Sequence, residues 1–432
     1  MTLGSSELRA LATRHGDDLA HLALRHALAA GGPRRLLEWT ERWRAADLTQ
    51  PPTRPPAEAR LAEQLAELRR QAPLIGNQGT RGGRGGRAAL ETAIRHRLHR
   101  LPGTAGATAR LDVPRLVDAV DGDVLVEIVE VDGHLHLLTV TRGRVRRHAG
   151  GTLAEAVEAL TAARFLLRQV ARGRPADLGG IGERLQGALL GAAAPALAAA
   201  PPSARVVISA PARLHTAPWG LLPVLAPRPV SVVPSAAMWL RARDRRRPEG
   251  DRTVLVAGPG LGTGGAEVDV LAADHPHWTL LRDGAATAPA TLEALDGATL
   301  AHVAAHGRFR PDSPMFSSLA LDDGPLTVHD LELLHAPPYR LVLSACDSGV
   351  MVPVGEHALL GLVASLLSLG TAGIVASVAE VNDAATVDLM VGLHAGLGAG
   401  AAPDEVLLRA REAAGDDRTA LATAAAFAAL GV

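Results

Sequence analysis

The sequence has few of the residues that build disulfide-linked or metal-bound scaffolds. Only one of its 432 residues is cysteine, so an internal disulfide and a zinc site made of several cysteines are both excluded. Lysine is absent, and all 44 basic residues are arginine against 45 acidic residues. The resulting net charge of -1 lacks the overall basic character that is typical of nucleic-acid-binding proteins.

Long uncharged runs are also scarce. Residues 1–32 are interrupted by charges and lack the apolar core and cleavage site of a signal peptide. Residues 358–379 carry no charge, but Gly370, Thr371 and Gly373 divide them, which predicts a buried helix at 358–369 followed by a strand at 373–378. We therefore expect a cytoplasmic protein without a membrane span. The hydrophobic content of 47% predicts a large core.

The first hundred residues predict a helical N-terminal region. Leucines at helical spacing recur over most of residues 5–74, and a proline-rich segment at 50–56 separates two helical parts. A glycine- and arginine-rich segment at 76–87 is followed by an expected helix at 88–101. Such a segment also occurs in nucleic-acid-binding proteins, but its shortness favours a flexible loop, and we expect no nucleic-acid partner. The domain boundaries are therefore expected at 1–100 for this region and 115–432 for the rest.

The pattern changes from Asp123 onwards. Alternating apolar and polar residues predict a small antiparallel meander with turns at Asp132–Gly133 and Arg142–Gly143. Strands and helices then alternate, which is typical of a mostly parallel sheet flanked by helices, an α/β fold. We expect an N-terminal subdomain at 115–250 and a second half at 251–432. The expected strands are 205–209, 230–233, 253–257, 279–281, 300–304, 340–343 and 373–378. The expected helices are 153–169, 181–199, 236–242, 288–295, 358–369, 384–397 and 403–413.

Two of the expected strands end in reactive side chains. The strand at 300–304 leads into His306 and Gly307, and the strand at 340–343 leads to Cys346. Since working residues gather at the carboxyl ends of parallel strands, neighbouring strands would place the imidazole and the thiol in one crevice. The imidazole would increase the thiolate fraction and protonate the departing amine. The backbone N–H groups of Gly307 and Cys346 are the natural donors to an oxyanion.

The motifs around these residues resemble those of the CHAT domain, a caspase- and separase-like cysteine protease module. They include residues 302–307, 314–321, 343–349 and 370–373, and the resemblance extends over about residues 120–432. It implies a caspase-like fold and a dyad of His306 and Cys346. It also implies cleavage of a partner protein through a thioester acyl-enzyme without metal or organic cofactor. The tryptophan that usually follows the strand at 373–377 in this family is missing.

The resemblance also implies a biological setting and a substrate pocket. The setting is regulated bacterial defence or signalling, in which the N-terminal region binds an activator protein or domain. Three acidic residues near the predicted site are candidates for a pocket that favours a basic side chain before the cut bond: Asp347, Glu380 and Asp383. The position of Asp383 in the family pattern makes it the strongest of the three.

Three alternatives remain open from the sequence. The chain could keep the fold as a catalytically silent interaction or scaffold module. The loop Gly258–Gly265 fits a dinucleotide-binding pattern with Asp283 after the next strand, although this interpretation leaves the His–Gly and Ala–Cys elements unexplained. His302 and His306 have zinc-like spacing, but that motif requires a helix and a glutamate, whereas the local pattern indicates a strand.

Overall fold

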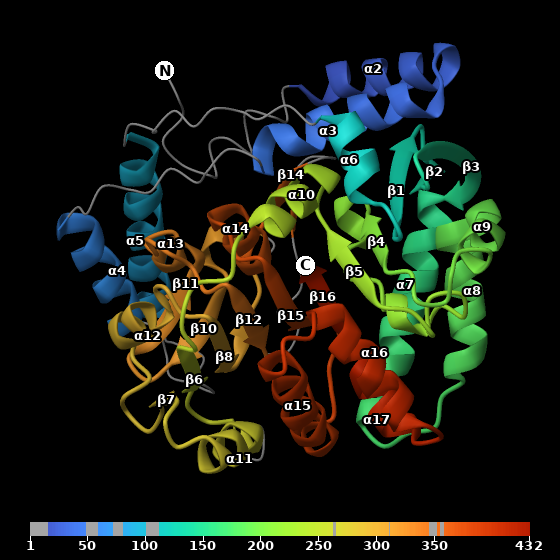
Figure 1. Cartoon of the computed structure of the whole chain (residues 1–432). Coiled ribbons are helices and arrows are strands. Elements are labelled where there is room, and N and C mark those ends of the chain that lie inside the picture. The colour runs from blue at the N-terminus through green and yellow to red at the C-terminus, as the bar shows by residue number, and fades with distance from the viewer. Residues whose placement is uncertain are drawn as a thin grey trace.

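The fold is organised around one large sheet. The computed structural model describes residues 16–48, 59–71, 81–100, 112–261, 265–310, 312–344, 352–354 and 358–432. Its main sheet has 11 strands in the order β3-β2-β1-β4-β5-β16-β15-β12-β8-β6-β7 (Figure 1). Successive residues of a strand pack into different core clusters, so both faces of the sheet are covered. The predicted α/β fold with a mostly parallel sheet is confirmed.

The antiparallel meander forms one edge of this sheet. It consists of β1 (Val124–Val131), β2 (His134–Thr141) and β3 (Arg144–Thr152). Both of its turns have two residues with positive φ, 53° and 78° at Asp132–Gly133 and 47° and 75° at Arg142–Gly143. These angles match the turn type whose twist suits a two-residue hairpin, which confirms the predicted turns.

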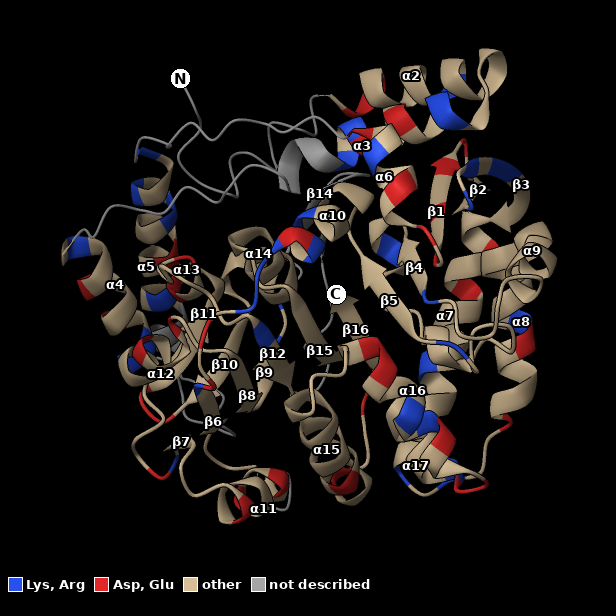
Figure 2. Ribbon diagram, viewed as in Figure 1, with Lys and Arg blue, Asp and Glu red and all other residues tan. Residues whose placement is uncertain are grey.

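The remaining strands of the main sheet agree closely with the sequence-based expectation, except for the last one. They are β4 (Val206–Ser209), β5 (Val230–Val233), β6 (Thr253–Ala257), β7 (Thr279–Leu281), β8 (Leu300–Ala304), β12 (Arg340–Leu343), β15 (Gly373–Ser377) and β16 (Phe427–Gly431). The unpredicted β16 lies parallel to β5 and antiparallel to β15, and so joins the two halves of the sheet. The four strands around this junction, β4, β5, β15 and β16, carry no charged residue (Figure 2).

The helices from residue 113 onwards flank the main sheet. They are α6 (Val113–Ala119), α7 (Leu153–Ala171), α8 (Leu178–Leu190), α9 (Ala194–Ala198), α10 (Ala236–Asp244), α11 (Ala266–Asp274), α12 (Ala288–Leu295), α13 (Val328–Leu331), α14 (Leu362–Leu369), α15 (Asp383–Gly398), α16 (Pro403–Ala414) and α17 (Arg418–Ala425). Within the described ranges, none of the helices combines the length and apolar character needed to cross a bilayer.

Two of the predicted helices need correction. The helix expected at 181–199 is interrupted, because Gly191 ends α8 with a φ of 45° and α9 follows after a short 3-10 turn. The helix expected at 358–369 begins only at Leu362. Residues 358–360 instead form β14, which pairs with β13 (Val352–Val354), and Gly361 with a φ of 138° separates the hairpin from the helix.

A small second sheet follows β8. It contains β9 (Gly307–Arg308), β10 (Ser318–Leu321) and β11 (Gly324–Thr327) in the order β11-β10-β9 and was not predicted. Its first strand begins directly after His306. The backbone around this histidine is therefore held by two sheets.

The N-terminal helices pack at two separate places (Figure 1). Helices α2 (Asp17–Ala30) and α3 (Pro33–Leu48) share a core with β1 and α10, while α4 (Ala59–Arg70) and α5 (Arg81–Arg100) enclose Phe316 just before β10. Because α5 begins at Arg81, the predicted loop at 76–87 is wrong for residues 81–87. Residues 76–80 lie outside the described part.

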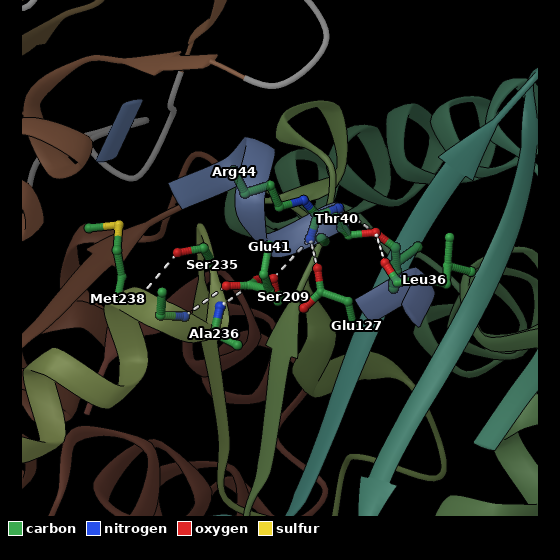
Figure 3. A network of polar contacts seen from close by, with 12 residues as sticks. Leu36, Thr40, Glu41, Arg44, Glu127, Ser209, Ser235, Ala236 and Met238 are labelled. Atoms are coloured by element: carbon green, nitrogen blue, oxygen red, sulfur yellow. Dashed lines mark hydrogen bonds and ion pairs between the residues drawn. The ribbon is translucent and has the colours of Figure 1, made fainter. Parts of the chain in front are cut away.

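Buried charges fix α3 to the sheet (Figure 3). The Arg44 guanidinium donates hydrogen bonds to Glu127 on β1 and, over 2.8 Å, to Ser209 at the end of β4. Both oxygens of Glu41 accept backbone N–H groups at the start of α10, at 2.8 and 2.9 Å. One helix thus contacts three elements that are far apart in the sequence.

This network contains two carboxylates and one guanidinium, all buried. Burial raises the pKa of Glu127 well above its ordinary value; Arg44 opposes this rise and the nearby Glu41 adds to it. Each carboxyl oxygen of Glu41 accepts a hydrogen bond from a backbone N–H group. By contrast, Oε2 of Glu127 is buried without a hydrogen-bond partner in the described structure. Of the two carboxyl groups, Glu127 therefore has the pKa that burial raises further, and it is the one that keeps its proton to higher pH.

The proton on Glu127 makes stability depend on pH. The unfolded chain loses this proton near its ordinary pKa of about 4.3, but the folded protein keeps it to higher pH, so stability falls as the pH rises through the raised pKa. Glu127→Gln removes this dependence. We expect the free energy of unfolding of the variant, relative to wild type, to increase as the pH rises above about 5 in urea titrations. The exposed Glu158→Gln should show no such trend, and an equally flat difference for Glu127→Gln would contradict the assignment.

Candidate active site

The two strands that lead to the predicted reactive residues are neighbours. β8 and β12 pair in parallel, with Val303 opposite Leu343, and the N–H of Ser344 donates to the carbonyl of Val303 over 3.2 Å. His306 lies two residues beyond the end of β8 and is exposed. Cys346 follows Ser344 by two residues in the sequence but lies outside the described residues. The predicted adjacency of the two strands is confirmed.

A backbone carbonyl orients the imidazole of His306. Its Nε2 lies 3.0 Å from the carbonyl oxygen of Gly260. Since a carbonyl only accepts hydrogen bonds, this contact assigns the ring proton to Nε2 and leaves a lone pair on Nδ1. The histidine is thereby held in the tautomer that can take a proton at Nδ1.

The Gly260 carbonyl that contacts His306 belongs to a loop for which the sequence predicted no role in the active site. Gly260 follows β6, which is the other neighbour of β8 in the sheet. A Cβ at Gly258 would lie 2.4 Å from the carbonyl oxygen of Ala320 and 3.0 Å from the Cβ of Ala305, so glycine permits a close approach next to His306. The glycine pattern was visible in the sequence, but the order of the strands that gives it this role was not.

Gly307, the predicted oxyanion donor, starts β9. The N–H of Ala320 donates to the carbonyl of His306 over 2.9 Å, which makes these two residues a hydrogen-bonded antiparallel pair. Hydrogen-bonded and non-bonded pairs alternate along such a ladder, so the next pair, Gly307 with Leu319, is non-bonded. The N–H of Gly307 therefore points away from β10. Gly307 is also exposed.

A chain of buried polar groups lies beside the strand ends. The Ser344 hydroxyl donates to Oε1 of Glu267 over 2.8 Å, and Nε2 of His302 is 2.9 Å from the same hydroxyl oxygen. Nδ1 of His302 is in turn 3.0 Å from Nε2 of His394. The chain connects α11, β12, β8 and α15 immediately before the Cys346 segment.

The proton positions in this hydrogen-bond chain follow from the bond between Ser344 and Glu267 at one end of it. Because Ser344 gives its only hydrogen to Glu267, its oxygen accepts from Nε2–H of His302, and Nδ1 of His302 accepts from Nε2–H of His394. Both rings are then neutral. Burial lowers the pKa of His302 to about 3, and burial together with His302 lowers the pKa of His394 well below its ordinary value. His302 therefore has a structural role and is not the partner of His306 in a zinc site.

The candidate pocket residues are in different surroundings. Glu380 accepts two hydrogen bonds from Arg172, both of 2.9 Å, and lies 3.5 Å from Arg168, so its charge is already balanced. Asp383 is the exposed first residue of α15, which follows the carboxyl end of β15. Asp347 lies outside the described residues.

Comparisons with known proteins agree with this architecture. The family model of the CHAT domain matches residues 180–431, more than half of the chain. The chain belongs to the CHAT family. A search of curated proteins finds no match to this CHAT chain.

Two solved structures show the same fold. They are crystal structures of the Saccharomyces cerevisiae separase–securin complex at 3.0 and 2.6 Å resolution, with TM-scores of 0.56 and 0.58 and sequence identities of 11% and 10%. The matches cover 92% and 98% of the CHAT chain, but only 33% and 37% of the solved chains. The CHAT chain therefore spans about a third of the length of these relatives, and the likeness is one of fold.

The buried chain should contribute measurably to stability. Ser344→Ala leaves the N–H of His302 and the carboxylate of Glu267 without their partner, and each lost bond of this kind costs about 1–3 kcal/mol. We expect the free energy of unfolding to fall by about 2–4 kcal/mol in chemical denaturation. The exposed Ser203→Ala should change it by less than about 0.5 kcal/mol. Equal values for the two variants would contradict the proposed hydrogen-bond chain.

Proposed function

We propose that this CHAT protein is a cysteine endopeptidase of the caspase-like type, with Cys346 as nucleophile and His306 as acid and base. The observation that carries the proposal is the parallel pairing of β8 with β12. In this register Ser344 follows the strand at the level of Ala304, and each reactive residue comes two positions later. Two residues of chain reach at most about 7 Å, and this short reach supports the proposal that Cys346 acts at the edge of the sheet that carries His306.

The proposed reaction uses the lone pair on Nδ1 of His306. This nitrogen takes the proton of the Cys346 thiol, and the thiolate attacks the carbonyl carbon of the peptide bond. The carbon–nitrogen bond then breaks while the imidazolium protonates the departing amine. Water, deprotonated by the same imidazole, hydrolyses the thioester and restores the thiol. The bond from Nε2 to the Gly260 carbonyl stabilises the imidazolium and holds the ring in place.

The oxyanion of each tetrahedral intermediate needs hydrogen-bond donors. We assign this role to the backbone N–H groups of Gly307 and Cys346. The orientation of Gly307 away from β10 supports the assignment, because its N–H is not used by the ladder. Loss of one such donor typically costs about 2.7–4 kcal/mol of transition-state stabilisation. The mechanism requires no metal or organic cofactor.

The substrate is proposed to be a partner protein, cut in regulated bacterial defence or signalling in the cytoplasm. The N-terminal region is suited to receive an activator because its helices reach elements around the site. Helix α4 packs on β11, and its Arg69 donates to Asp330 of the following helix α13 over 2.8 Å. Helix α3 lies against β14, which follows the Cys346 segment in sequence. A change in these helices would therefore be transmitted to both reactive segments.

The main alternative is a catalytically silent scaffold with the same fold. A nucleotide-binding role for the loop Gly258–Gly265 is less well supported, because the Gly260 carbonyl already holds His306. Isothermal titration with NAD or ATP tests the nucleotide alternative directly.

The single cysteine makes the enzyme proposal simple to test. With a thiol-reactive activity probe at neutral pH, any labelled cysteine must be Cys346. We expect labelling of the wild type, none of Cys346→Ala, and labelling at least about tenfold slower for His306→Ala, since general-base assistance typically contributes about 10²–10⁴. The exposed His134→Ala is the matched control and should label like the wild type.

Substrate cleavage is then measured by proteomic comparison of cut sites produced by wild-type and Cys346→Ala protein. Cut sites that persist with Cys346→Ala, or equal labelling of wild type and His306→Ala, would refute the dyad. Labelling without any cut site would favour the scaffold alternative.

Asp383 is proposed to favour a basic residue before the cut bond. Profiling with a peptide library should show a preference for arginine or lysine at this position. Asp383→Asn should reduce that preference about twofold to fivefold, the scale of an exposed charge pair of about 0.4–1 kcal/mol. Asp388→Asn, which changes another exposed aspartate of α15, should leave it intact. No preference for basic residues in the wild type would end this proposal.

A further inference from the structure

A cavity far from His306 lies between α10 and the end of α14. Its volume is about 320 Å³, at the lower end of the range found for small-molecule sites. Its lining contains two arginines and no acidic residue. The lining residues are Val233, Pro234, Met238, Arg241, Ala242, Arg245, 367–371 and Gly431. β15 begins beside this cavity and runs towards the edge that carries His306, so the two sites lie at opposite ends of the strands.

Arg241 lies in the last turn of α10 and Arg245 directly follows the helix, and both line the cavity. The Nη2 of Arg245 donates to the carbonyl of Pro337 over 3.0 Å. Its Nη1 is buried and has no hydrogen-bond partner among the described residues. A buried charged donor without a partner is costly, which indicates that a group absent from the protein itself accepts this hydrogen bond.

A second polar atom in the lining shows the same deficit. Thr371 is 1% exposed, and its hydroxyl oxygen has no hydrogen-bond partner in the described structure. Thr371 follows Gly370, which ends α14 with a φ of 115°. A Cβ at Gly370 would lie 3.5 Å from Nη1 of Arg245, so the guanidinium lies directly against this turn. The two unpartnered groups therefore belong to one site.

Arginines elsewhere in the described structure pair with carboxylates or donate to backbone carbonyls, as Arg411 does to the carbonyl of Arg228. Arg44 pairs with Glu127, and Arg205 with Asp404. In the cavity, burial lowers the pKa of both Arg241 and Arg245, and no carboxylate is among the lining residues. Most of the remaining wall is apolar and includes Val233, Met238 and the leucines of the last turn of α14. The cavity thus combines positive charge with an apolar surface.

We propose that this cavity is a binding site for a small ligand that carries an oxyanion, a phosphate or a carboxylate, on a short apolar body. The oxyanion accepts hydrogen bonds from Nη1 of Arg245 and from the Thr371 hydroxyl, and Arg241 adds positive charge. The apolar body lies against Val233, Met238 and Leu367. The site does not depend on the peptidase proposal.

The probes are hexyl phosphate and hexanoate, titrated into the full-length chain by isothermal titration calorimetry, with neutral hexanol as the comparison. We expect saturable binding of at least one anion and none of hexanol. Arg245→Met should weaken binding at least about tenfold, because hydrogen bonds to charged groups are the strong ones, and Thr371→Val should weaken it severalfold. The exposed neighbour Arg246→Met, which does not line the cavity, should bind like the wild type.

Comparison of the two anions identifies the oxyanion, and binding of either one supports the site. Thermal melts in the presence of the bound anion give an independent readout, since a ligand that binds only the folded state raises the melting temperature. Absence of saturable heat with both anions would overturn the proposal, as would unchanged affinity in both Arg245→Met and Thr371→Val. In that case the arginines only balance the negative end of the α14 dipole.

Discussion

The backbone pairing of β8 with β12 is the constraint on which the candidate site depends. Their parallel register, continued by the bond from Ser344 to Val303, brings two chain segments out of the sheet at one edge and side by side. The sequence of neither segment specifies that the two segments lie side by side. Their proximity depends on the strand order of the whole sheet. The chemistry proposed for His306 and Cys346 follows from this geometry and from no local motif alone.

Around this pairing, the structure holds the site from several sides. The loop after β6 fixes the ring of His306 through the Gly260 carbonyl, and the small sheet fixes the backbone that follows. Behind the strand ends, His302 and Ser344 belong to a hydrogen-bond chain in which every proton has a defined position. Such support is what a catalytic constellation needs, because side chains that are loosely held lose the geometry of the reaction.

The sequence predicts local elements far better than it predicts their neighbours. β8 and β12 were delimited correctly because each is a short, mostly apolar run, followed by His306 and Gly307 in one case and by Ser344 in the other. β16 was missed because Phe427–Gly431 lies in an alanine-rich run whose local preference is helical, and its position between two strands overrides that preference. The role of Gly260 and the network of Arg44 with Glu127 were not predictable, because each depends on contacts between segments far apart in the sequence.

The position of β16 in the sheet also constrains how the protein is made. β16 is synthesised after the other ten strands of this sheet, yet it lies in the interior of the sheet between β5 and β15. Until it emerges from the ribosome, the two halves of the sheet have no shared strand, and each exposes an apolar edge at this place. The two halves can collapse separately during translation, but the joined sheet is completed only when β16 has been made. The continuous sheet can therefore form only after residue 431 has been synthesised.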